Sequence, residues 1–208
     1  MDNDGQVMQA AARTFHPPRA ASVVATHTID ASPRRGEAES FVRRAFARRF
    51  GAHVPAFAPN LMLLEAEARI VAVAGWRPAA GDALFLERYL DAPVEQAVSR
   101  IAGHTVPRAR IVEVGNLAAG KLGGSLHVIA VLADHLLRQG YEWVVFTATS
   151  ELIGMFARLG LPLPVVARAD PARLGAAASA WGSYYEAGPI VVAGRIRFAV
   201  ERFGRDAS

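Results

Sequence analysis

Glu113 and Asn116 are the residues whose type and position best suit chemistry. They lie in Arg110–Ser125, a stretch that alternates like a strand and then becomes a glycine-containing loop. A carboxylate among apolar strand neighbours has a raised pKa, which suits a general base near neutral pH. The alternative for Glu113 is exposure to solvent, or an ion pair with Arg110 or Arg77. Asn116 offers an amide donor to a carbonyl group, and its alternative is a hydrogen bond within the turn.

The loop after this strand has the composition of an anion site. It contains Gly120, Lys121, Gly123, Gly124 and Ser125, and Lys121 is the only lysine in the chain. The loop leads into a helix that the apolar spacing predicts over 126–137. Loop amides and a helix N-terminus both attract negative charge, so this element predicts phosphate binding. An ordinary β–α turn is the alternative.

Two further segments supply polar or aromatic candidates. Glu87, within Leu84–Leu90, is a candidate catalytic residue of an acceptor site, or it pairs with an arginine. Tyr184 and Tyr185 are candidate acids, or they pack as aromatic rings in the loop expected over 181–188. The histidines show no metal-ligand spacing, and no Gly-x-Ser-x-Gly is present, so neither a metal site nor an α/β-hydrolase is expected.

The periodicity predicts alternating strands and helices, which indicates an α/β sandwich with a mixed sheet. A turn is expected near Glu67-Ala68, and Asp91 and Ser150 are expected as helix N-caps. A helical tail is expected over 195–203. The expected strands are 21–29, 60–65, 69–76, 109–117, 141–147, 162–167 and 189–193, and the expected helices are 37–50, 91–101, 126–137, 150–159 and 170–180.

The composition places the chain among globular proteins. It is 52% apolar and 20% charged over 208 residues, with no apolar run of the roughly 18 residues that span a bilayer. Residues 1–18 are expected to be a disordered leader without signal-peptide character, and 19–208 a single domain. The absence of cysteine fits the cytoplasm. The excess of arginine reflects codon usage or a surface for phosphates or an acidic carrier protein, and no nucleic-acid partner is expected.

A strand, a glycine loop and a helix, followed by a buried strand and a helix ending Phe156-Ala-Arg-Leu-Gly-Leu161, resemble the core of the GNAT acyltransferases. This resemblance implies an α/β/α sandwich with a mixed, mostly antiparallel sheet. A more specific set of motifs resembles the thermostable hemolysin family, whose fold is expected to be like that of acyl-homoserine-lactone synthases. That set is Leu84-Phe-Leu-Glu-Arg-Tyr-Leu-Asp91, Glu113-Val-Gly-Asn-Leu-Ala118, Trp143-Val-Val-Phe-Thr-Ala-Thr149 and Trp181-Gly-Ser-Tyr-Tyr185.

The resemblance implies where the donor, an acyl-CoA or acyl-carrier-protein thioester, would bind. The phosphates would lie on the glycine loop, and the acyl-pantetheine arm between two splayed strands, against Val114, Gly115, Leu117, Phe146 and Thr147. The chain also departs from these families. Gly120 replaces the leading Arg or Gln of the GNAT phosphate loop, and Phe156 replaces a tyrosine acid. Glu113-Val-Gly-Asn116 keeps the glutamate of the synthase motif but lacks its Ser-Arg pair, so synthesis of homoserine lactones is not expected.

The sequence therefore predicts a GNAT-like acyltransferase that acylates an amine, either an amino acid or another small amine. Two alternatives stay open. One is a membrane-active haemolysin, for which the helix at 37–50 carries arginines and phenylalanines. The other is a catalytically inactive fold that binds acyl thioesters.

Overall fold

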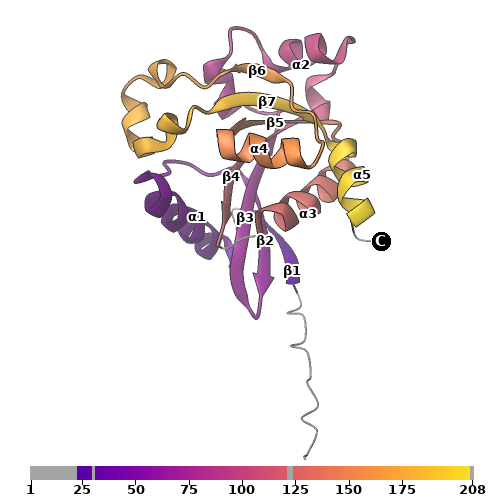
Figure 1. Ribbon diagram of the computed structural model, residues 1–208. Coiled ribbons are helices and arrows are strands. Elements are labelled where there is room, and N and C mark those ends of the chain that lie inside the picture. The colour runs from indigo at the N-terminus through magenta and orange to yellow at the C-terminus, as the bar shows by residue number, and fades with distance from the viewer. Residues whose placement is uncertain (1–22, 30, 121–123, 207–208) are drawn as a thin grey trace, which may run out of the picture.

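A computed structural model describes residues 23–29, 31–120 and 124–206, which form a seven-stranded sheet in the order β1-β2-β3-β4-β5-β7-β6 (Figure 1). Among the described strands only β4 and β5 pair in parallel, so the mixed, mostly antiparallel sheet is confirmed. The leader expected over 1–18 lies outside these ranges. The strands are β1 (Val23–Thr28), β2 (Asn60–Ala66), β3 (Arg69–Pro78), β4 (Ile111–Ala119), β5 (Trp143–Ala148), β6 (Val165–Arg168) and β7 (Ile190–Arg195).

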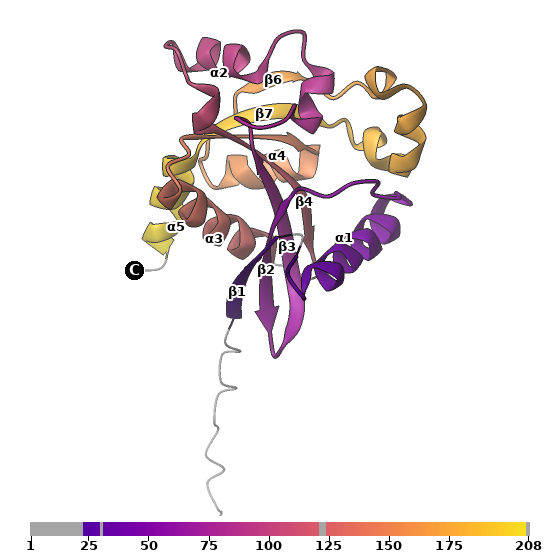
Figure 2. The same cartoon turned by 180° about the vertical axis from the view of Figure 1, so that it is seen from behind.

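Helices cover both faces of this sheet (Figures 1 and 2). None of the helices in the described part of the chain is long and apolar enough to cross a membrane. The α-helices are α1 (Arg35–Phe50), α2 (Val94–Ala102), α3 (Gly124–Arg138), α4 (Ser150–Arg158) and α5 (Ile196–Asp206), and the 3-10 helices are η1 (Phe85–Tyr89), η2 (Arg108–Arg110) and η3 (Pro171–Ala187).

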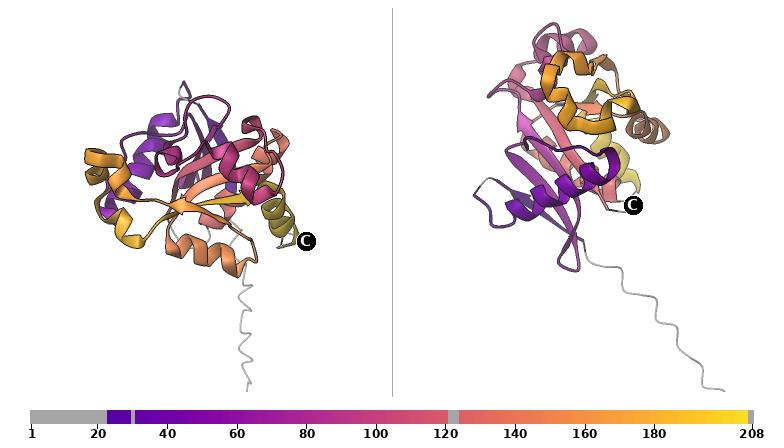
Figure 3. Two further views of the ribbon diagram at one scale, coloured as in Figure 1. Left: turned by 90° about the horizontal axis from the view of Figure 1, so that it is seen from above. Right: turned by 90° about the vertical axis from the view of Figure 1, so that its left-hand side faces the viewer.

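The pleat of the central strands divides the core into two layers. On β3, Val73 packs with α1, whereas its neighbours Ala72 and Ala74 pack with α3. On β4, Ile111 packs with η1 and α2, and Val112 packs with α3. Consecutive strand residues point to opposite faces, so α1, η1, α2 and η3 form one layer and α3, α4 and α5 the other. Figure 3 shows the same arrangement from above and from the side.

The β2–β3 hairpin turns where the sequence predicted. Glu67 and Ala68 both have positive φ angles, 51° and 59°. Two such residues in a row give the turn the twist that antiparallel strands need. The strain in a non-glycine residue at positive φ is tolerated here because the long pairing of β2 with β3 holds the turn closed.

Both predicted N-caps are wrong. The cap of α2 is Pro93 and that of α4 is Thr149, and neither makes a side-chain cap hydrogen bond. Ser150 instead donates to the carbonyl oxygen of Ala187 at 3.1 Å, and Asp91 forms an ion pair with Arg173. Tertiary partners in η3 therefore outcompete the local capping geometry for both side chains.

The region after Asp170 also differs from the prediction. The helix expected over 170–180 and the loop over 181–188 form one 3-10 segment, η3, broken at Gly175 and Gly182. Both glycines have φ and ψ values that only glycine adopts readily, 57° and −135° at Gly175 and 53° and −131° at Gly182. The predicted tail helix is confirmed as α5.

Candidate active site

β4 and β5 are paired at their beginnings and then separate. Their register runs from Ile111 opposite Trp143 to Val114 opposite Phe146, although β4 continues to Ala119. In Figure 1, β6 and β7 lie above β2 and β3 and run sideways, whereas β2 and β3 run up and down, so the strand direction changes across the middle of the sheet. Beyond Val114, the β4 backbone groups that face β5 have no strand partner within the described ranges, which leaves them available to a ligand.

β4 contains one extra residue beside this opening. Gly115 pairs with Gly75 and Ala118 pairs with Val73, so three steps along β4 match two along β3. Asn116, at this bulge, has a φ of 49°, in the left-handed region, which asparagine tolerates better than most residues. A bulge adds local twist to its strand, and this one directly follows Val114, the last β4 residue paired with β5.

A cavity of about 960 Å³ has walls on both faces of the sheet. Residues 115–119 of β4 and Phe146 and Thr147 of β5 border it as well, so the opening between these strands is part of the cavity. The part in the layer of α1 and η3 is polar and aromatic, with the walls Arg77, Phe85, Tyr89, Glu113, Trp181, Tyr184 and Tyr185. The part in the layer of α3, α4 and α5 is mostly apolar, and its walls include Ile129, Val144, Leu152, Met155, Leu159 and Phe198.

Glu113 lies where the two strands begin to separate, one residue before Val114, and only 8% of it is exposed. Its Oε2 accepts from the backbone amide of Phe85 and its Oε1 from that of Leu86, both at 2.9 Å. Burial raises the pKa of Glu113, while these two hydrogen bonds and the Arg77 guanidinium oppose the rise. Each oxygen keeps a second lone pair, so the carboxylate can still accept a proton from the cavity.

Arg77 lies directly opposite Glu113 in the β3–β4 register and also borders the cavity. Its Nε lies 3.6 Å from Glu113 Oε2, which is too long for a hydrogen bond. Its guanidinium donates no hydrogen bond to any residue that the structure describes. The side chain is 27% exposed, so it carries its charge in a largely enclosed place.

Glu87 is not part of the cavity wall. Arg108 donates to both of its oxygens, at 2.6 and 2.7 Å, and the backbone amides of Leu84 and Val94 donate at 2.9 Å. The Arg108 hydrogen bonds are the main reason why the pKa of Glu87 falls to about 2. Of the alternatives that the sequence left open, the ion pair is observed, and it fastens the segment between β3 and β4.

Asn116 uses its side chain to hold the loop between α1 and β2. Its Oδ1 accepts from the backbone amide of Ala58 at 2.9 Å, and its Nδ2 donates to the carbonyl oxygen of Ala56 at 3.4 Å. The second N–H of the carboxamide makes neither of these bonds. Asn116 borders the cavity, so this N–H is available to a ligand there.

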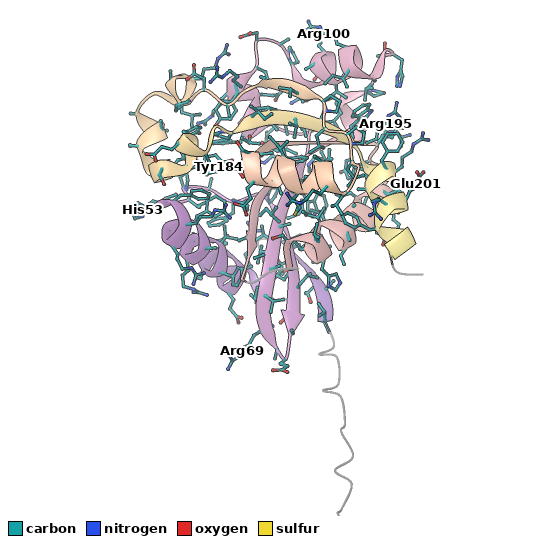
Figure 4. The ribbon with its side chains drawn as sticks, viewed as in Figure 1. His53, Arg69, Arg100, Tyr184, Arg195 and Glu201 are labelled. Carbon is teal, nitrogen blue, oxygen red and sulfur yellow. The ribbon has the colours of Figure 1, made fainter. Side chains whose placement is uncertain are left out.

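Aromatic side chains form the wall of the cavity on the α1 side. The Tyr184 ring lies 6.5 Å from that of Phe46 and 5.2 Å from that of Phe50, and Figure 4 shows Tyr184 between η3 and α1. The hydroxyl groups of Tyr185 and Tyr89 lie 2.5 Å apart. Burial raises the pKa of Tyr184, Tyr185 and Tyr89, so all three phenols are protonated at neutral pH.

The residues expected to bind the acyl donor fall into three groups according to their position relative to the cavity. Gly124 begins α3 outside the cavity wall, where a Cβ would lie 3.5 Å from the carbonyl oxygen of Val71. Lys121 and Gly123 lie outside the described residues. The others all border the cavity, and they are Val114, Gly115, Leu117, Phe146, Thr147, Gly120 and Ser125.

Phe156 contributes to the apolar part of the cavity. It is buried, and its ring lies 5.6 Å from that of Phe146. Both rings pack with apolar residues of α4 and α5. The position that carries an acid in many GNAT enzymes is therefore part of an apolar wall here, and no proton donor is available from it.

The sequence did not single out Arg77 as a site residue in its own right, nor the aromatic wall. The signal for Arg77 was present, because the hairpin turn at Glu67-Ala68 and the pairing of β3 with β4 place it beside Glu113. The aromatic wall joins α1, η1 and η3, which are far apart in the chain, and no local pattern indicates that they meet.

The fold and the parted strands define a GNAT-like α/β protein, and the family model for thermostable hemolysin matches residues 29–200. This chain therefore belongs to the thermostable hemolysin family. No curated protein matches the sequence.

Solved structures support the same fold. The AHL synthase LasI has a TM-score of 0.57 and 12% identity, over 87% of this chain and 95% of LasI. FeeM, an N-acyl amino acid synthase from uncultured soil microbes, also has a TM-score of 0.57 and 12% identity, over 87% of this chain and 96% of FeeM. The CoA-dependent acyl-homoserine lactone synthase BjaI, solved with SAM and isopentyl-CoA, has a TM-score of 0.56 and 15% identity, over 88% of this chain and 87% of BjaI.

Proposed function

We propose that this protein transfers an acyl group from a thioester of coenzyme A or of an acyl carrier protein to an amine. One observation carries this proposal. The cavity has an apolar part, called the chamber below, and a polar part bordered by Glu113, and the opening between β4 and β5 lies where the two parts meet. A thioester joins an apolar chain to a polar arm, and it needs such a junction. The similar folds of an N-acyl amino acid synthase and of a synthase solved with isopentyl-CoA support the proposal.

The donor lies along β4 in this proposal. The β4 backbone groups beyond Val114, from Gly115 to Leu117, bind the pantetheine arm in the manner of an added strand. The acyl chain enters the chamber between α3, α4 and α5, whose walls are apolar. Such a chamber favours a fatty acyl chain over an acetyl group, because most of the chamber's apolar surface would make no contacts with an acetyl group.

Glu113 is the base. As the amine nitrogen attacks the thioester carbonyl carbon, Glu113 takes the proton that the nitrogen loses. The remaining N–H of Asn116 and the Leu117 amide are the candidate donors to the oxyanion. The carbon–sulfur bond then breaks, and the thiolate takes a proton from Tyr185, which solvent reprotonates while Glu113 releases its proton to solvent. The Tyr185–Tyr89 hydrogen bond positions this acid, since Phe156 offers none.

Thiol release is the direct test. The chain contains no cysteine, so a thiol reagent added to the purified protein reports only the released coenzyme A or carrier-protein thiol. Dodecanoyl-CoA and dodecanoyl-carrier protein are each supplied with a panel of amino acids and primary amines. Thiol release that requires an amine, with the matching acyl amide found by mass spectrometry, is expected for at least one combination.

Two variants make the test specific. Glu113→Gln is expected to lower the rate about 10²- to 10⁴-fold, the usual contribution of a general base. Glu142→Gln is the matched control at a half-exposed glutamate, and no change is expected. Vesicle leakage is measured in parallel without thioester. Leakage by wild type and Glu113→Gln alike, with no thiol release, would instead support a membrane-active protein.

A further inference from the structure

We infer that Arg77 binds a carboxylate of the acceptor, so that the acylated amine is an amino acid or a similar carboxylate-bearing amine. This inference rests on the acyl transfer proposed above and names the acceptor class of that site. Arg77 is a specificity-determining residue here, and it touches the acceptor rather than the reacting bond.

The first argument is that Arg77 lacks the partners that enclosed arginines have elsewhere in this chain. Arg108 donates to Glu87, Glu95 and the carbonyl oxygen of Ala79, at 2.6 to 2.7 Å. Arg35, which is also buried, donates to Glu39 and to two backbone carbonyl groups. A partly enclosed guanidinium without hydrogen-bond acceptors is unfavourable, so an acceptor from outside the chain would stabilise it.

The second argument is that Glu113 does not satisfy Arg77. The two oxygens of Glu113 accept from the backbone amides of Phe85 and Leu86, and Arg77 approaches only through Nε at 3.6 Å. The two terminal nitrogens of Arg77 keep their donors. A guanidinium edge with two parallel donors matches a carboxylate, which accepts both in a bidentate pair.

The third argument is that the donor phosphates are too far away to be the anion. They would lie near the N-terminus of α3, where β4 ends and Gly120 follows. Gly120 is seven residues beyond Glu113, the residue that faces Arg77. At about 3.3 Å per strand residue, this separation is roughly 20 Å. The anion on Arg77 therefore belongs to the second substrate.

The position of Arg77 also suits the acceptor. It borders the polar part of the cavity, opposite the proposed base Glu113, which precedes the last β4 residue paired with β5. A carboxylate bound there holds the amine of the same small molecule close to both Glu113 and the strand opening. The aromatic wall of Phe85, Trp181 and Tyr184 leaves room for an apolar side chain beside it.

Binding of product analogues tests this inference without requiring turnover. The ligands are N-dodecanoyl-phenylalanine and N-dodecanoyl-phenylalaninamide, which differ only by carboxylate against carboxamide, with the corresponding glycine pair as a smaller set. Calorimetry on the full chain is expected to show the acid binding about 10- to 100-fold more tightly than the amide, as for a charge-assisted hydrogen-bonded pair. Arg77→Gln is expected to remove this preference by weakening the acid and leaving the amide unchanged.

Two further variants sharpen the result. Arg77→Lys keeps the charge but loses the bidentate edge, so part of the preference is expected to remain. Arg49→Gln is the matched control, because Arg49 also borders the cavity but already pairs with Glu151, and the full preference is expected to remain. Circular dichroism verifies that each variant is folded.

The outcomes separate the two proposals. The assignment of Arg77 is overturned if wild type binds the acid and the amide equally, or binds neither. It is also overturned if the preference for the acid survives Arg77→Gln. If wild type prefers the acid but releases no thiol in the transfer assay, the carboxylate site is supported and only the acyl-transfer proposal is contradicted. If thiol release is as efficient with amines that lack a carboxylate as with amino acids, acyl transfer is still supported but the proposed acceptor class is overturned.

Discussion

Asn116 and Ala58 connect the bulge of β4 to the loop that precedes β2. The Asn116 side-chain oxygen accepts from the Ala58 backbone amide at 2.9 Å, across 58 residues of sequence. The same loop contributes Pro55, Ala56 and Phe57 to the cavity wall. One side chain therefore joins the bulge of β4 to a neighbouring wall of the cavity.

Replacing Asn116 with Ala is expected to destabilise the protein by about 2 kcal/mol. The change leaves the Ala58 amide without its acceptor and puts an alanine at positive φ. Asn116→Asp is the matched control, because it keeps an acceptor oxygen and tolerates this backbone conformation, and a loss below about 1 kcal/mol is expected. Urea denaturation measures both. Equal losses in the two variants would show that the bond to Ala58 contributes little.

The pair of Glu87 and Arg108 is expected to stabilise the fold in a pH-dependent manner. The pKa of Glu87 is about 2 in the folded protein, below its ordinary 4.5, so its contribution is complete above pH 4.5 and is lost as the pH falls toward 2. Glu87→Gln is expected to cost roughly 3 kcal/mol at pH 7, because it removes the carboxylate that accepts two hydrogen bonds from Arg108 and leaves that charge only Glu95 and the Ala79 carbonyl oxygen. Urea denaturation is to be repeated at pH 3, where the difference between wild type and variant is expected to shrink. A difference that is the same at both pH values would contradict this account.

The pH dependence of acyl transfer is expected to report Glu113. Burial raises the pKa of this carboxyl above its ordinary 4.5, and the base works only when it is deprotonated. With both substrates saturating, kcat is therefore expected to fall as the pH is lowered through a value above 4.5. In Glu113→Gln this acidic limb is expected to disappear along with most of the rate. An unchanged limb in the variant would assign it to another group.

Gly182 and Gly175 form a matched pair for the docking of η3 on α1. Both have nearly the same positive-φ conformation, but a Cβ at Gly182 would lie 2.1 Å from the carbonyl oxygen of Phe50, whereas nothing lies within 4 Å at Gly175. Gly175→Ala is expected to cost only backbone strain, about 1 to 3 kcal/mol.

Gly182→Ala is expected to cost clearly more than Gly175→Ala, because the backbone of η3 must move away from α1. Trp181 and Tyr184 move with it, so binding of the N-dodecanoyl amino acid is expected to weaken only in this variant. Thermal unfolding and calorimetry measure the two effects. Equal stabilities for the two variants would show that η3 can shift without cost.

The arrangement of strands and helices was largely predictable because it depends on local patterns. The buried run Trp143–Phe146 and the apolar spacing of α3 each predict an element without knowledge of the rest of the chain. The prediction was weakest where two locally similar outcomes compete. An alanine-rich segment after Asp170 has the composition of an α-helix, yet it forms a 3-10 segment with glycines at positive φ and a hydrogen bond from His53, after α1, to the carbonyl oxygen of Ala180.

The candidate site was predictable only in part. Glu113, Tyr184, Tyr185 and the β4 residues after Glu113 do border the cavity, because their place at a strand end or in an aromatic stretch is a local property. Glu87 was equally plausible by type, but it lies in an ion pair with Arg108, which is 21 residues away. A carboxylate is available for chemistry or committed to structure according to its partner, and a sequence pattern does not contain that partner.

The sequence by itself determined the order of elements, the fold class, the family and the strand that carries Glu113. The tertiary structure decided that β4 separates from β5 after Val114, that the cavity passes between them, and that Arg77 lies beside Glu113 without a hydrogen-bond acceptor. The physical reason is range. Side-chain periodicity and turn geometry act over a few residues, whereas strand register, burial and ion pairing join segments that meet only when the chain is folded.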